Sequence, residues 1–114
     1  MNFNPIAWVW LTLAIIGEII ATTSLKASKE LTVLTPTLLI VVGYGAAFYF
    51  MILAMRHLPV AITYSFWSAL GIVFITIVSM IRFGEKPDAP AIIGIGLIVL
   101  GVVVITVFSK MKAG

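Results

Sequence analysis

One acidic side chain, Glu18, lies in the middle of a long apolar stretch, where an ionised group is costly. Insertion scales put that cost at about 2.5–3.5 kcal/mol, so a charge at this depth usually serves a function. No Lys or Arg lies in any long apolar stretch, so Glu18 has no fixed ion-pair partner. Glu18 is therefore predicted to hold a proton or a cation. The alternative is a protonated Glu18 that only hydrogen-bonds a neighbouring helix.

Residues around Glu18 at helical spacing favour a binding site over a purely structural role. Its own face carries small, apolar and hydroxyl side chains: Leu11, Ala14, Ile15, Ala21 and Thr22. Two further faces carry aromatic side chains: Tyr44, Phe48 and Met51 on one, and Tyr64, Trp67, Ser68 and Gly71 on the other. An acid surrounded by aromatic rings can bind an organic cation by charge pairing and cation–π contact. For each ring taken alone, packing inside the protein or facing lipid is the better explanation, and it is the coincidence of two such faces with one lone acid that favours a cation site. Tyr64 is also a possible hydrogen-bond partner of Glu18.

Four apolar helices must position these residues. Stretches of about 20 residues, the length that crosses a bilayer core, are predicted over residues 5–25, 36–55, 59–81 and 89–109. The segments between them are short and polar. We therefore expect an all-α fold with a single four-helix transmembrane domain over residues 1–114, inserted as a multi-pass protein of the inner (plasma) membrane.

Composition excludes several other classes of protein. The 114 residues are 62% hydrophobic and 10% charged, whereas soluble domains are about a quarter charged. There is no cysteine and only one histidine, so no metal site is expected. The sequence contains no phosphate-binding loop, activated nucleophile or carboxylate pair, so neither an enzyme nor a bound cofactor is predicted. The net charge of +3 comes from loops and the tail and does not indicate nucleic-acid binding.

Small residues mark two further features. Gly71 lies in the middle of the third stretch, where a helix could bend, and is predicted to be a hinge. Ala91, Gly94 and Gly101 recur along the fourth stretch, and small residues let helices approach closely in lipid. They are predicted to form a dimerisation face. Close packing within one chain is the alternative.

The charges of the loops do not select one orientation in the membrane. Orientation follows Lys and Arg in short loops near the spans. Three such residues lie on one predicted side and four on the other: Arg56, Lys110 and Lys112 against Lys26, Lys29, Arg82 and Lys86. Insertion in both orientations would permit an antiparallel dimer. The alternative is one orientation set by other factors.

Three segments closely resemble the small multidrug resistance transporters, in particular their quaternary-ammonium branch. They are residues 18–28 (Glu-Ile-Ile-Ala-Thr-Thr-Ser-Leu-Lys-Ala-Ser), 64–73 (Tyr-Ser-Phe-Trp-Ser-Ala-Leu-Gly-Ile-Val) and 90–94 (Pro-Ala-Ile-Ile-Gly). The resemblance covers nearly the whole chain. It implies an antiparallel homodimer of dual topology that exports organic cations in exchange for protons, with no other cofactor.

The resemblance also implies roles for individual residues. Glu18 matches the carboxylate that protons and substrate share, and Gly71 matches a bend in the third helix. Residues matching the cavity lining are Leu11, Ala14, Ile15, Thr22, Tyr44, Phe48, Tyr64 and Trp67. Ala69 departs from the family pattern, which has a second glycine there. A guanidinium-exporting branch typically has Trp and Ser where this chain has Ala21 and Ala47, so the quaternary-ammonium branch fits better.

Other functions stay open at this point. A guanidinium or polyamine exporter of the same family is one alternative. A proton or cation channel and a membrane subunit that only assembles with a partner are two more. A channel predicts flux without obligatory exchange, and a mere subunit predicts that Glu18→Gln is silent. The lipid-carrier relatives lack the membrane glutamate, so Glu18 argues against them.

Overall fold

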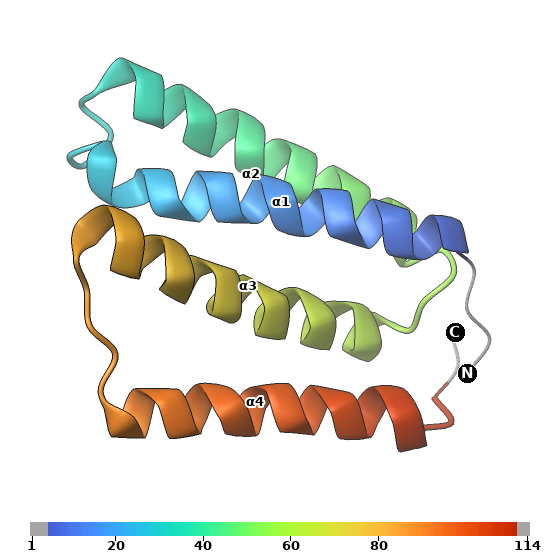
Figure 1. The fold of residues 1–114 in the computed structure, drawn as a ribbon. Coiled ribbons are helices and arrows are strands. Elements are labelled where there is room, and N and C mark those ends of the chain that lie inside the picture. Colours follow the sequence, from blue (N-terminus) through green and yellow to red (C-terminus); the bar gives the residue numbers. More distant parts are fainter. Residues whose placement is uncertain (1–4, 112–114) are drawn as a thin grey trace.

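Four helices and no strand make up the part of the chain that the computed structural model describes, residues 5–111 (Figure 1). The helices are α1 (Pro5–Ala27), α2 (Leu34–Ala54), α3 (Val60–Phe83) and α4 (Ala89–Phe108). The predicted all-helical fold is therefore confirmed. The predicted ends are close to these, although α1 and α3 each continue two residues further and α2 begins two residues earlier.

Each helix is long and apolar enough to cross a membrane. At 1.5 Å per residue, 20 to 24 residues span about 30–36 Å, which matches the roughly 30 Å hydrocarbon core of a bilayer. The apolar side chains that would be costly in water are largely exposed along these helices. The chain is thus a multi-pass integral membrane protein.

The helices lie side by side in a flat row, in the spatial order α2, α1, α3, α4 (Figure 1). The molecule is only 18 Å thick in its shortest dimension, whereas a single helix with its side chains is about 10–12 Å across. Packing is closest between α1 and α2, and α4 contacts α3 at the far edge of the row. None of the residues of α4 is buried. Large apolar side chains are exposed on all four helices of this row.

The helix ends follow from local sequence. Pro59 precedes the first residue of α3, and Pro90 lies in the first turn of α4, where a missing N–H has no helical partner to lose. The carboxylate of Asp88 caps α4 by accepting the backbone N–H of Ala91 at 3.1 Å. Gly84 ends α3 with a φ of 68°, a left-handed conformation that glycine adopts at little cost.

The connection between α1 and α2 is a left-handed turn built without glycine. Lys29, Glu30 and Leu31 have φ values of 47°, 62° and 68°. Such residues cost roughly 1–2 kcal/mol each in this conformation. Ser28, which is 2% exposed, offsets part of this cost because its carbonyl accepts two backbone N–H groups and its hydroxyl a third.

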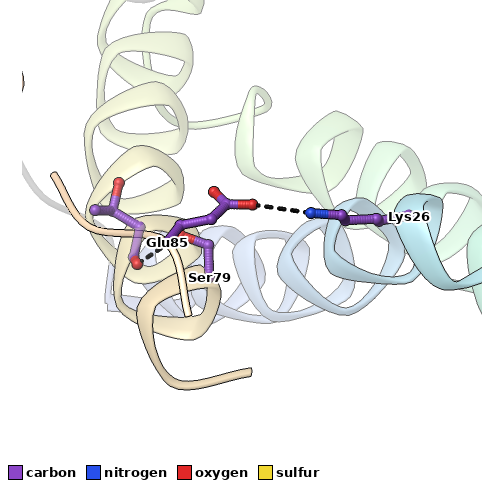
Figure 2. A network of polar contacts seen from close by, with 4 residues as sticks. Lys26, Ser79 and Glu85 are labelled. Carbon is purple, nitrogen blue, oxygen red and sulfur yellow. Dashed lines mark hydrogen bonds and ion pairs between the residues drawn. The ribbon is translucent and has the colours of Figure 1, made fainter. Parts of the chain in front are cut away.

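An ion pair joins the end of α1 to the loop between α3 and α4 (Figure 2). The ammonium of Lys26, at the end of α1, lies 3.3 Å from Oε2 of Glu85 and 4.9 Å from the ring centre of Phe83. Glu85 is held by its own backbone N–H, which donates to the carbonyl of Ser79 (Figure 2). Both partners are more than half exposed, so the pair contributes little to stability. It does place Lys26 and the 84–88 loop on the same side of the membrane.

Candidate functional site

Glu18 lies midway along α1 and is half-buried. Its oxygen Oε1 accepts a hydrogen bond from the hydroxyl of Thr22, one turn further along the helix, at 2.9 Å. Its other oxygen, Oε2, is buried and has no hydrogen-bond partner within residues 5–111. An ionised carboxylate with an unpaired buried oxygen is unfavourable. A proton or a bound cation at Oε2 would remove that cost.

A hydroxyl of α2 extends this hydrogen-bond chain. The hydroxyl oxygens of Thr22 and Tyr44 are 2.7 Å apart. Since Thr22 has one hydrogen and donates it to Glu18, Tyr44 is the donor to Thr22 when Glu18 is ionised. Tyr64, which the sequence suggested as a partner of the carboxylate, instead makes a ring contact with Trp67. In this structure Thr22 is the partner of Glu18, backed by Tyr44.

The carboxylate opens onto a pocket of about 310 Å³ between α1 and α3. Its walls combine the one acid with aromatic, hydroxyl, glycine and aliphatic residues, namely Glu18, Tyr64, Trp67, Ser68, Gly71, Ile72 and Ile75. Apart from Glu18, all of them lie on one face of α3, as the sequence predicted for the first four. Among the lining residues, only Glu18 carries a charge.

Gly71 provides the space that the carboxyl group occupies. A Cβ added at Gly71 would lie 3.2 Å from Oε2 of Glu18, so a side chain there would force the carboxyl group to shift by a few tenths of an ångström. Helix α3 runs unbroken through this position. The role of Gly71 that this structure displays is therefore close approach to Glu18, and its use as a hinge remains a prediction.

Aromatic rings continue from the pocket toward α2. The ring of Trp67 meets the rings of Tyr64 at 5.5 Å and Phe48 at 5.8 Å, both edge to face. Phe48 in turn lies 6.3 Å from Tyr44. The indole N–H of Trp67 is buried and finds no acceptor within residues 5–111. These rings from two helices form one continuous aromatic wall beside Glu18, which suits a cationic ligand with apolar groups.

Three predicted lining residues of α1 occupy the protein interior instead of this pocket. Leu11, Ala14 and Ile15 are at most 5% exposed. Leu11 and Ile15 pack in a core cluster with Ala54 and Leu58, with Trp67 against it. In the single chain Leu11 and Ile15 support Trp67 from the core side, and direct contact of Leu11, Ala14 and Ile15 with a ligand remains a prediction.

Two lining residues were missed by the sequence reasoning. Ile72 and Ile75 extend the pocket along α3 beyond Gly71. They lie eight and eleven residues after Tyr64, so the same helical spacing that identified Trp67 and Ser68 could have found them. In a membrane-spanning helix, residue type does not distinguish an aliphatic side chain that lines a pocket from one that packs against another helix or faces lipid.

The small residues of α4 face open space. Beyond the adjacent backbone of α4 itself, a Cβ added at Gly94 or Gly101 would meet no atom of residues 5–111 within 4 Å. Ala91 is only partly buried, and its backbone N–H is held by the cap at Asp88. Close packing within the chain, the alternative explanation for Gly94 and Gly101, is absent from the described residues. The same residues contain no group of three His, Asp or Glu side chains that could hold a metal ion.

Comparison with known proteins gives consistent results over most of the chain. The sequence profile of the family described as Small Multidrug Resistance protein matches residues 6–98. The chain is 46% identical over 106 residues to the quaternary ammonium compound-resistance protein QacE of Escherichia coli, covering 93% of this chain and 96% of that protein.

Two further relatives have similar names. The quaternary ammonium compound-resistance protein QacF of Klebsiella aerogenes is 47% identical, with 93% of this chain and 96% of that protein covered. A multidrug transporter of Pseudomonas aeruginosa is also 47% identical, with 90% of this chain and 94% of that protein covered. With a family match across four apolar helices and relatives at this identity, the chain belongs to the small multidrug resistance family of membrane transporters.

Proposed function

We propose that this protein exports lipophilic organic cations, quaternary ammonium compounds among them, in exchange for protons. The observation that carries the proposal is the unpaired, buried Oε2 of Glu18 at a pocket walled by Tyr64 and Trp67. The names of QacE and QacF support the substrate class. Glu30, Glu85 and Asp88, the other three acids of the chain, lie in loops outside the helices.

Competition for one carboxylate couples the two ions. The protonated group is neutral and does not attract a cation, whereas the ionised group in this apolar site needs one. A proton that reaches Glu18 therefore releases the cation, and a cation that binds releases the proton. Trp67 and Tyr64 add cation–π attraction and apolar contact for the groups around the charge.

A second copy of the chain completes the site in this proposal. One chain is a layer 18 Å thick with a pocket open on its face, and a partner would cover it. The free face at Gly94 and Gly101 of α4 is suited to close helix contact with that partner. In an antiparallel dimer the two chains would be related in the same way as the two inverted repeats of a longer transporter chain. That arrangement permits alternating access. The two Glu18 carboxyl groups would then share one cavity.

Binding of tetraphenylphosphonium to the purified protein, measured across pH, tests this function. The affinity should rise with pH until Glu18 is ionised and then level off, and each bound cation should release protons into the medium. Affinity that does not change between acidic and alkaline pH, with no proton release, would refute the shared-site proposal. Loss of binding at high pH would refute it equally.

Specificity for large cations follows from the aromatic wall. Aromatic quaternary ammonium compounds should displace tetraphenylphosphonium far better than guanidinium does, because guanidinium lacks the apolar groups that would contact the rings of Tyr64 and Trp67. Trp67→Ala should weaken aromatic cations by about 1–2 kcal/mol, roughly 5- to 30-fold in Kd. Val73→Ala, a truncation in the same helix away from the pocket lining, is the control. Guanidinium ranking first in the competition would favour the guanidinium-exporting alternative.

A further inference from the structure

Helices α1 and α2 touch backbone to backbone immediately beside the functional residues. A Cβ added at Gly17 would lie 2.9 Å from the carbonyl oxygen of Gly43, and one added at Gly43 would lie 2.8 Å from the carbonyl oxygen of Gly17. Carbon–oxygen contacts across helix interfaces are normally about 3.3–3.6 Å. Both glycines are buried. Any side chain at either position would therefore push the helices apart by about half an ångström.

The two glycines are the direct sequence neighbours of the residues that the hydrogen-bond chain joins. Gly17 precedes Glu18, and Gly43 precedes Tyr44. The bond from Tyr44 to Thr22 crosses between the same two helices at 2.7 Å. Hydroxyl–hydroxyl bonds are made at about 2.5–3.0 Å, so a separation half an ångström larger would break or greatly weaken it.

Ala21 and Ala47 belong to this helix contact and not to the ligand pocket. Ala47 lies against Gly17 and Ala21 against Gly43, and both alanines are 0% exposed. They are the two positions at which a guanidinium-exporting branch typically has Trp and Ser. In this chain they fill the contact between α1 and α2, and neither is among the residues that line the pocket.

We propose that the Gly17–Gly43 contact positions Tyr44 so that its hydroxyl supports the Thr22–Glu18 hydrogen bond and thereby sets the pH at which the site exchanges a proton for a cation. This inference rests on the proposed function and deepens it. The glycines touch no ligand, and they act through the distance between the helices. Donation from Tyr44 makes Thr22 a stronger donor to the carboxylate, which favours the ionised form of Glu18.

Few other groups face the carboxyl group and could set that pH instead. Tyr64 is the other titratable group of the pocket lining, contributed by α3. Tyr44 is the titratable group from α2, and Thr22 from α1 does not titrate. Helix α4 contacts α3 at the far edge of the row and contributes nothing to the lining. No Lys, Arg or His lies among the lining residues.

Tetraphenylphosphonium binding across pH to the full-length variants tests the inference. Gly17→Ala and Gly43→Ala should raise the pH of half-maximal binding by about half a unit, in the same direction as Tyr44→Phe, because each removes the hydrogen bond that supports the ionised carboxylate. Gly45→Ala is the matched control, because a Cβ there meets no atom of residues 5–111 within 4 Å beyond the adjacent backbone of α2 itself. Its midpoint should equal that of the natural chain.

The double variant Gly17→Ala with Tyr44→Phe separates positioning from general packing. If Gly17 acts through the Tyr44 hydroxyl, the double variant should have the midpoint of Tyr44→Phe alone. Additive shifts would overturn the proposal, as would glycine variants that bind with the natural midpoint. Tyr44→Phe leaves the helix contact intact, so an unchanged midpoint in that variant overturns the proposal even if an alanine variant does not insert. Failure of the proposed function is distinguishable, since the natural chain itself would then show no pH dependence.

Discussion

The Glu18→Gln variant should insert and assemble normally but lose both pH-dependent cation binding and resistance of cells to quaternary ammonium compounds. Glutamine is nearly isosteric and its side-chain oxygen can still accept the hydrogen bond from Thr22 within α1. The bond between Thr22 and Tyr44, which joins α1 to α2, is therefore kept. It can neither release a proton nor carry the negative charge that attracts a cation. We expect growth in the presence of the compound to fall to that of cells without the protein.

The control for this variant is Glu85→Gln, which removes an acid that is 53% exposed and paired with Lys26 in a loop. Because exposed ion pairs contribute little, it should retain resistance. Membrane protein levels of both variants should be measured in the same cells. If cells that produce Glu18→Gln at a normal membrane protein level stay resistant, the result would support a subunit that only assembles with a partner.

Two chains forced into opposite orientations should be inactive alone and active together. The basic residues at and between the helix ends are nearly balanced between the two sides. Arg56 and Lys110, with Lys112 outside the described residues, oppose Lys26, Lys29, Arg82 and Lys86, so a few charges should decide the orientation. Two lysines added at the C-terminus, with Lys26 and Lys29 replaced by serine, should fix that terminus in the cytoplasm. Replacing Arg56 and Lys110 by serine should fix the opposite orientation.

Resistance in cells that produce one or both variants gives the first readout, and labelling gives the second. The chain has no cysteine, so a single cysteine at the C-terminus reports orientation with an impermeant thiol reagent. About half of the unmodified chains should react in intact cells. Labelling near zero or near completion would contradict dual topology and favour a parallel dimer or a related partner chain.

The helices and the acid could be predicted because each depends on sequence that is local. Long apolar stretches specify helices that cross a bilayer, and Glu18 stands out because its surroundings are apolar for a full turn on either side. The rings of Tyr64 and Trp67 were found for the same reason, since both lie on one face of one helix.

The contacts between helices could not be predicted, because they depend on how each helix is rotated against its neighbours. Leu11 and Ile15 share a helix face with Glu18 in the sequence pattern. That face is broad, however, so Leu11 and Ile15 on one edge pack in the core while Glu18 on the other edge borders the pocket. The chain from Tyr44 through Thr22 requires the backbone approach at Gly17 and Gly43. No periodicity shows which of the nine glycines makes that approach and which, like Gly45, faces open space.

Exchange in vesicles containing only the purified protein tests the central claim, that one carboxylate serves protons and cations in turn. An acidic vesicle interior should drive accumulation of an aromatic quaternary ammonium compound. A gradient of that compound should in turn drive protons in the direction opposite to the compound's movement. Both fluxes should vanish in Glu18→Gln. Cation movement that dissipates its own gradient without moving protons, or proton flux that needs no cation, would contradict the account and indicate a channel.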